Sequence, residues 1–399
     1  MSQPEKTLLL AVTGMSPQVV TETLYGIYKK GLEWPDQIKI FTTKKGFDQA
    51  RLNLLVKGKL KALCTEYNLT LPAFTEEDIE IIPDANERPV DDARTLEDQQ
   101  ALANFITQRV GKLSEDSNTR IHASIAGGRK TMTFFLGYAM SIFGREYDRL
   151  SHVLVSPEFE NNRDFYFPTL SSAAIEDAKG VSLDSKDAEV MLAEIPFVSQ
   201  RSLFSSERLS QFSNFDYNTL VSHIKLAQQP TQIKLEFVYD RHKPTVMVNN
   251  IEIEFSRRQL DFAFYAMLAR EQEEGEEIIR PKTEGDLAAV TSVLYKELAL
   301  IANLPMDWHK DEMAFLKKLE DSDVLDSRSV KSLAGNGNNM GLTTNLFDSR
   351  LNYLTDYLTS KLPAALVNII KPVKTRQDTK QDYVYKILLA PYQVSFSKE

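Results

Sequence analysis

Residues 7–13 read TLLLAVT, residue 14 is Gly, and residues 16–29 read SPQVVTETLYGIYK. The first stretch is short and almost wholly apolar, which is typical of a buried strand. The second stretch has apolar residues at helical spacing, with Pro17 in the opening turn, where proline is favoured. The sequence therefore predicts a buried strand that feeds a helix through a turn at Gly14.

This strand-and-helix pattern recurs along the first half of the chain. Further strand-like runs lie at 38–43, 79–83, 121–127, 152–157 and 165–169, and helical patterns lie at about 46–67, 95–113 and 130–143. Strands that alternate with helices indicate a mainly parallel, doubly wound sheet. We therefore predict a Rossmann-like α/β domain over residues 1–200.

Composition places limits on the protein's class. The chain has 399 residues and is 42% hydrophobic, which is enough for about two domains with cores of their own. Cys64 is the only cysteine, so an intrachain disulfide and a cysteine-based zinc site are both excluded. The five histidines are scattered without metal-ligand spacing. We expect no metal and no cofactor.

Hydropathy and charge limit the kinds of partner that the protein is expected to bind. No apolar window approaches the roughly 18 residues of a membrane span, and residues 1–6 are polar, so we expect a cytoplasmic protein with no membrane partner. The formal net charge is −9, which argues against general attraction to nucleic acid. Any anionic ligand must then be held by a local group of residues.

Two strand-to-helix turns carry residues suited to such a ligand. In an open parallel sheet, the ligand crevice lies beyond the carboxyl ends of the strands, where helix N-termini offer unpaired N–H groups and partial positive charge. Glycines let a backbone approach phosphates closely, and Arg and Lys supply cations. The expected ligand-binding residues are Thr13, Gly14, Met15, Ser16, Thr43, Gly127, Gly128, Arg129, Lys130 and Thr131.

Common nucleotide motifs do not fit these turns. The first turn reads TGMSPQ and lacks the G-x-G-x-x-G of dinucleotide sites, and GGRKT places Arg129 where a Walker A loop has glycine. Neither NAD nor ATP is therefore indicated. Taken alone, Gly-Gly-Arg-Lys also fits an ordinary tight turn with solvated cations. Two such turns at matching strand ends favour a phosphate site.

The motifs SPQVVTETLYGI (16–27) and SIAGGRKTM (124–132) together resemble the CARF-domain proteins of type III CRISPR systems, in particular their ring-nuclease-like group. The resemblance covers about residues 1–200. It implies a homodimer whose paired domains form one pocket for a cyclic oligoadenylate, most often cyclic tetraadenylate. A ring of phosphodiesters is a multiply anionic ligand, and a two-fold dimer would place both turns around it twice.

Some members of that family cleave the ring without a metal, through attack of a ribose 2′-hydroxyl on the neighbouring phosphorus. For this chain the resemblance implies that Ser16 orients the backbone and that Arg129 and Lys130 stabilise the transition state. No histidine base is needed, and His122 and His152 are expected in strands as core or edge residues. A further basic residue is implied late in the domain, for which Arg201 is a guess.

After a transition at 201–232, residues 233–399 resemble a winged helix-turn-helix, an α+β fold. The stretch SRRQLDFAFYAMLAR (256–270) predicts a core helix capped by Ser256, and Asn249-Asn250 predicts a turn between strands. Residues 349–362 would be the recognition helix and 371–386 the wing. The candidate contacts to double-stranded DNA are Arg350 and Asn352 for bases, and Lys371, Lys374 and Arg376 for phosphates.

The function of the second domain stays open at this point. Asp348 and Asp356 on the same helix oppose DNA binding, so a winged fold used for dimerisation or for covering the sensor is an equal alternative. A C-terminal ribonuclease is not supported, because Arg241 stands directly beside His242 and not at the spacing of R-x4-6-H. The two hypotheses are a ring nuclease and a ligand-controlled DNA-binding regulator without ring cleavage.

Overall fold

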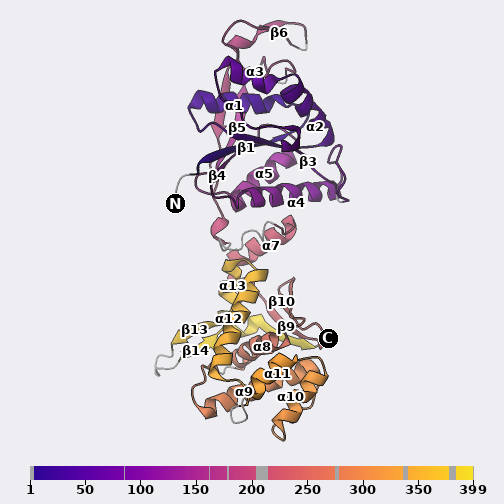
Figure 1. The fold of residues 1–399 in the computed structure, drawn as a ribbon, viewed down its shortest axis with the longest axis vertical. Helices are drawn as coiled ribbons and strands as arrows, with labels where there is room; N and C mark the ends of the chain where they lie inside the picture. Colours follow the sequence, from indigo (N-terminus) through magenta and orange to yellow (C-terminus); the bar gives the residue numbers. More distant parts are fainter. Residues whose placement is uncertain are drawn as a thin grey trace. The chain divides into compact units, whose positions relative to one another are not determined.

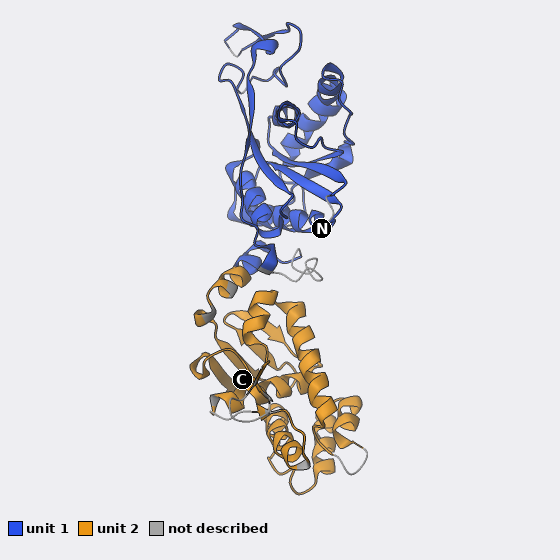
Figure 2. Cartoon of the chain, turned by 90° about the vertical axis from the view of Figure 1, so that its left-hand side faces the viewer, with its two compact units in different colours: residues 1–221 blue, residues 222–399 orange. Residues whose placement is uncertain are grey.

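The computed structural model describes residues 4–84, 86–160, 162–177, 179–203, 214–274, 278–335, 340–376 and 383–398. The chain divides into two compact units, Met1–Val221 (unit 1) and Ser222–Glu399 (unit 2), which Figure 2 shows in different colours. The division falls inside residues 201–232, the stretch assigned from sequence as the transition. Helix α7 (Tyr217–Gln228) spans the division.

Unit 1 is built on a six-stranded sheet in the order β3-β2-β1-β4-β5-β8. Its strands are β1 (Lys6–Thr13), β2 (Gln37–Thr42), β3 (Ile79–Ile81), β4 (Thr119–Ser124), β5 (Arg149–Val155) and β8 (Val190–Glu194). The first five are parallel, and β8 runs antiparallel to β5. The predicted mainly parallel α/β sheet is confirmed. A hairpin of β6 (Ala174–Glu176) and β7 (Ser182–Asp184) stands outside it.

The central strand β1 explains why the sheet forms around residues 7–13. All of its residues after Lys6 are buried, because β2 and β4 flank it and helices cover both faces. Figure 1 shows α1 and α3 on one face of the sheet and α4 and α5 on the other. These helices are α1 (Gln18–Lys30), α2 (Lys44–Ala50), α3 (Lys59–Glu66), α4 (Leu96–Leu113) and α5 (Lys130–Phe143).

The ends of α1 and α4 follow local sequence signals. Gly31 follows α1 in the left-handed conformation, with φ 64°, and its N–H donates to the carbonyls of Ile27 and Tyr28. Thr95 precedes α4 and forms a capping box, in which its hydroxyl accepts from the Asp98 N–H at 3.1 Å. Both ends therefore match the predicted helix bounds to within about two residues.

Two expectations for unit 1 were wrong, and one strand was not predicted. The helix expected over 46–67 is broken into α2, a π-helical turn (Arg51–Val56) and α3, with Gly58 in the left-handed conformation between the last two. Residues 165–169 are not a strand; Phe165, Tyr166 and Phe167 are buried on irregular backbone. Strand β8 was missed, although residues 191–198 read MLAEIPFV, a mainly apolar stretch that begins within this strand.

Unit 2 contains two sheets and a set of helices. One sheet has the order β11-β10-β9-β15 and the other β12-β14-β13. The strands are β9 (Leu235–Tyr239), β10 (Thr245–Val248), β11 (Ile251–Glu254), β12 (Ile278–Ile279), β13 (Val373–Arg376), β14 (Tyr383–Lys386) and β15 (Val394–Lys398). The helices are α8 (Gln259–Glu273), α9 (Glu284–Ala302), α10 (Glu312–Asp321), α11 (Ser327–Ala334), α12 (Thr344–Lys361) and α13 (Ala364–Ile370).

Helix α8 is the centre of the unit 2 core. Residues 262–269 are all buried, as expected for a helix that is apolar on every side. The Tyr265 hydroxyl donates to the Ile370 carbonyl at 2.6 Å, so this buried polar group is satisfied. Ser256 is not the cap: α8 begins after Arg258, which has no side-chain capping bond. The winged helix-turn-helix interpretation of unit 2 stays a prediction.

Candidate functional site

The turns after β1 and β4 touch each other backbone to backbone. A Cβ placed on Gly14 would lie 3.6 Å from the Gly128 Cα, and one on Gly127 would lie 3.0 Å from the Val12 carbonyl oxygen. Strands β1 and β4 are parallel neighbours. The strands β2 and β3 are added on one side of β1, and β4 and β5 on the other, so the strand order reverses between β1 and β4. This is the topological switch point, where open α/β sheets bind ligands.

A third turn, after β2, packs against the first. A Cβ on Gly46 would lie 2.8 Å from the Gly14 carbonyl oxygen, so only glycine fits there. The Thr42 hydroxyl donates to the Thr13 carbonyl at 2.7 Å and ties the ends of β1 and β2 together. The Thr43 hydroxyl accepts from the Gly46 N–H and caps α2. Thr43 therefore lies at the site, but its hydroxyl is already engaged.

The helix ends at this switch point are open to an anion. No side chain caps the N-terminus of α1, and the only side-chain acceptor at the start of α5, among the described residues, is the weak Met132 Sδ, 3.5 Å from the Arg129 N. Neither helix has an acidic residue in its first turn. Their first N–H groups and the partial positive charge of each helix end are thus not neutralised locally by side chains. Ser16 and Met15 are exposed in front of α1.

The side chains at the start of α5 are also accessible. Lys130 and Thr131 are exposed, and within the described ranges the Lys130 ammonium has no hydrogen-bond or ion-pair partner. Thr13, in contrast, is completely buried at the end of β1, and its hydroxyl has no partner among the described residues. The predicted residues therefore gather at one place, but they differ in exposure.

Arg129 is paired with an acid that sequence reasoning missed. Its Nε donates to one oxygen of the Asp92 carboxylate and its Nη2 contacts the other, while Arg94 donates to Asp92 at 2.9 Å. Hydrogen bonds from Arg129 and Arg94 lower the pKa of Asp92 to about 2. Asp92 comes from the segment between β3 and α4, which carries no motif; the only signal is the acidic pair at 91–92.

A second residue that sequence reasoning missed is Glu22 on α1. It is 9% exposed, and burial raises the pKa of its carboxyl from 4.5 to about 8. Among the described residues it has no ion-pair partner. Helical spacing places Glu22 opposite Val20, Leu24 and Ile27, so the sequence pattern predicts a solvent-facing acid and offers no signal of its burial.

His122 and Arg201 make their contacts with residues outside the two turns. His122 is buried in β4 and shares a hydrogen bond with the Ser151 hydroxyl at 2.8 Å, so its prediction as a core residue is confirmed. Arg201 donates to the Phe143 carbonyl at 2.7 Å, at the C-terminal end of α5. Lys130 begins that same helix, so the guess that Arg201 joins the site of its own chain was wrong.

A family model described as CRISPR-associated protein NE0113 (Cas_NE0113) matches residues 16–230, which is more than half of the chain; it begins at Ser16, after Gly14 and Met15, and includes the turn after β4. The chain belongs to this family. A comparison with curated proteins finds no match. The family assignment agrees with the CRISPR association expected from the motifs at 16–27 and 124–132.

Most of unit 2 lies beyond the residues that match the NE0113 family. Arg350 donates to Asp261 at 2.9 Å, and its guanidinium lies 4.8 Å from the centre of the Tyr353 ring. Asn352 and Lys374 are exposed, and Lys371 is half-buried. The side chain of Arg376 lies outside the described residues. DNA contacts by these residues stay a prediction.

Two further observations bear on this NE0113-family chain. None of the helices in the described part combines the length and the apolar character that crossing a membrane requires. The described residues also contain no cluster of three or more His, Cys, Asp or Glu side chains arranged to hold a metal ion.

Proposed function

We propose that this CRISPR-associated protein binds a cyclic oligoadenylate, with cyclic tetraadenylate as the first candidate, at the turns after β1 and β4. One observation carries the proposal: two glycine turns in contact with each other present two uncapped helix N-termini and the exposed Lys130. Phosphate groups are the ligands that such helix ends prefer. The resemblance to CARF-domain proteins supports the choice of ligand.

The ring also fits a homodimer. One chain supplies two uncapped helix ends, and two chains related by a two-fold axis supply four. Cyclic tetraadenylate has four phosphodiesters, so each could meet one helix end. We therefore propose a homodimer in which both protomers contribute turns to a single ring.

We further propose that the protein cleaves the ring and so ends the signal it carries. The ribose 2′-oxygen forms a bond to the adjacent phosphorus as the bond from phosphorus to the 5′-oxygen breaks. The 2′-hydroxyl loses its proton to solvent and the 5′-oxygen gains one, which leaves a 2′,3′-cyclic phosphate. In this proposal Ser16 holds the turn in position, and Lys130 and Arg129 stabilise the charge on the phosphoryl oxygens.

Arg129 can act there while it is paired. Its contacts with Asp92 use Nε and Nη2, and a guanidinium has five N–H donors in all. Three N–H groups therefore remain for a phosphate. Lys130, which has no such partner among the described residues, supplies the full positive charge.

The experiment is incubation of purified protein with labelled cyclic tetraadenylate in the absence of metal. We expect loss of the intact ring, slowed about a hundredfold in Lys130→Ala and also reduced in Ser16→Ala. Lys57→Ala, which removes another exposed lysine of unit 1, is the matched control and should cleave normally. Tight binding of the ring with no cleavage by the wild type would overturn the proposed enzymatic activity. Ring binding would then remain as the proposed function.

The second candidate function is a ligand-controlled DNA-binding regulator. It is favoured by the antiparallel pair β13 and β14 after α12, which lies where a wing is expected, and by the exposed Asn352 and Lys374. The pairing of Arg350 with Asp261 weighs against it, because that guanidinium is engaged within unit 2. A shift of promoter DNA that depends on the ring would support this function, and no shift at any ring concentration would reject it.

A further inference from the structure

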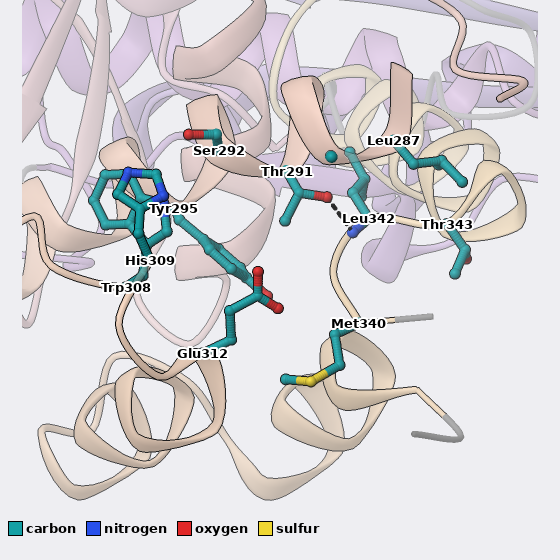
Figure 3. A pocket seen from close by; sticks show the side chains of 11 residues that line it. Leu287, Thr291, Ser292, Tyr295, Trp308, His309, Glu312, Met340, Leu342 and Thr343 are labelled. Atoms are coloured by element: carbon teal, nitrogen blue, oxygen red, sulfur yellow. Dashed lines mark hydrogen bonds between the residues drawn. The ribbon is translucent and has the colours of Figure 1, made fainter. Parts of the chain in front are cut away.

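Unit 2 contains a pocket that the proposed function does not use. Its volume is about 410 Å³, and it lies between α9, the chain that leads into α10, and residues 340–343 before α12 (Figure 3). Small-molecule sites commonly have volumes of about 300–1,000 Å³. The pocket is therefore large enough for a small ligand.

Two buried polar groups in this pocket have no partner. Tyr295 on α9 is 0% exposed and Trp308 is 5% exposed, and within the described ranges neither the Tyr295 hydroxyl nor the Trp308 Nε1–H makes a hydrogen bond. Buried polar groups in proteins are nearly always hydrogen-bonded, because leaving one unpaired opposes folding. Two unpaired groups that line one pocket point to a ligand that supplies their partners.

The remaining lining selects the kind of ligand. Leu287, Met340 and Leu342 make part of the wall apolar. Glu312 adds a carboxylate, and Figure 3 shows it together with the tip of the Tyr295 ring. Burial and the negative charge of Glu312 both raise the pKa of Tyr295, so its hydroxyl stays protonated and able to donate. A negatively charged group is disfavoured beside this carboxylate.

The pocket is also lined by Thr291, Ser292, His309 and Thr343. It therefore favours a ligand without negative charge that combines an apolar surface with several hydrogen-bonding groups. The ligand needs an acceptor for the indole N–H or the tyrosine hydroxyl, and a donor for the Glu312 carboxylate. A lipid chain would leave all three groups unpaired, and a sugar would expose many hydroxyls to the apolar wall. A nitrogen heterocycle with a ring nitrogen or carbonyl next to an amino group meets each requirement.

We propose that this pocket binds a nucleobase that carries an exocyclic amino group. The acceptor edge of the base faces Tyr295 and Trp308, and its amino group donates to Glu312. The inference does not depend on cyclic oligoadenylate binding, because every residue that it uses lies in unit 2. It concerns the base alone, so a free nucleoside and an unpaired base of a strand are both possible sources.

The test follows Trp308 fluorescence in the full-length protein. The chain has two tryptophans, so Trp34→Phe leaves Trp308 as the only reporter. Adenosine, guanosine, cytidine and uridine are titrated separately. We expect saturable quenching by at least one of the three nucleosides with an amino group, and binding at least about tenfold weaker for uridine, which has none. No saturable change with any nucleoside at millimolar concentration would overturn the proposal.

Single-atom variants then assign the contacts by calorimetry. Tyr295→Phe and Glu312→Gln should each weaken binding of the preferred nucleoside about five- to tenfold. Tyr265→Phe is the matched control: it removes a buried hydroxyl of the same unit that does have a partner, the Ile370 carbonyl. It should leave nucleoside binding unchanged.

Thermal unfolding without ligand gives an independent readout. Tyr265→Phe should lower the Tm of unit 2, because it breaks a hydrogen bond. Tyr295→Phe should leave the Tm unchanged or raise it, because its hydroxyl has no partner to lose. Equal losses of Tm in the two variants, or unaltered nucleoside binding in Tyr295→Phe, would overturn the assignment. An oligoribonucleotide of the preferred base is titrated in parallel with the free nucleoside. The tighter binder of the two shows whether the base comes from a strand or from a free nucleoside.

Discussion

The guanidinium of Arg129 contacts both carboxylate oxygens of Asp92, a residue that lies 37 positions earlier in the chain. The contact joins the segment before α4 to the N-terminus of α5, where the proposed phosphate site lies. An acid at this position lowers the local positive charge and holds the arginine in one place. Asp92 therefore offsets part of the positive charge that an anionic ligand would meet, although three N–H groups of Arg129 remain for that ligand.

The first prediction concerns this offset of charge. Asp92→Asn removes one negative charge beside the site and frees Arg129, so the affinity for cyclic tetraadenylate should rise about fivefold, or ~1 kcal/mol. Asp91→Asn removes the adjacent, exposed acid and should change the affinity less. Calorimetric titration measures both. Weaker binding by Asp92→Asn would show instead that the pair holds Arg129 in its binding position.

The second prediction compares two glycines of the touching turns. In Gly127→Ala the new Cβ would lie 2.8 Å from Val19 Cγ2 and 3.0 Å from the Val12 carbonyl oxygen, so unit 1 should lose about 1–3 kcal/mol of stability. In Gly14→Ala the nearest atom is at 3.6 Å, which is ordinary contact. That variant should fold normally yet bind the ring more weakly, because the backbone can no longer be approached as closely. Equal unfolding temperatures for the two variants would contradict this packing.

Much of the frame of this site was predictable from sequence. The strand at 7–13 and the helix at 130–143 have strong and distinct periodicities, and both match the structure within about a residue. Parallel order then brings Gly14 and Gly128 to the same edge of the sheet. Local pattern and tertiary packing agree here, which is why the prediction succeeded.

Other features depend on contacts that sequence patterns do not encode. The pairing of Arg129 with Asp92 joins segments that are remote in sequence, and nothing near residue 92 indicates its partner. Residues 165–167 are three consecutive aromatic residues, a composition typical of strands, but they bury their rings on irregular backbone, because apolar burial does not require a strand ladder. Gly58 ended a helix that periodicity alone would continue.

The third prediction uses the buried Glu22. Its pKa is about 8 in the folded protein and 4.5 in the unfolded chain, so the folded state favours the protonated form. Glu22 therefore has almost no effect on the free energy of unfolding below pH 4.5, and it destabilises unit 1 increasingly as the pH rises toward 8. Glu22→Gln should add about 4 kcal/mol to the free energy of unfolding at pH 8 and almost nothing at pH 4.5. Glu146→Gln, at an exposed site, should show no such pH dependence.

The fourth prediction uses His122, whose pKa burial lowers from 6.5 to about 4. Its neutral form supports the fold fully above pH 6.5, and this contribution is lost as the pH falls toward 4. The wild type should lose about 3 kcal/mol of stability through this residue over that interval. His122→Gln cannot titrate and should lose correspondingly less. Trp34 fluorescence in a Trp308→Phe background reports the unfolding of unit 1, and parallel pH profiles for the two proteins would reject the assignment.

The most direct test of the central claim, that the turns of two chains enclose one ring of phosphates, is a calorimetric titration of cyclic tetraadenylate into the Ser16→Ala protein, in which cleavage should be slow. The account predicts saturable binding with one ring per two chains, and a large loss of affinity when Lys130→Ala is added. A protein that stays monomeric and shows no saturable binding of the ring would contradict it.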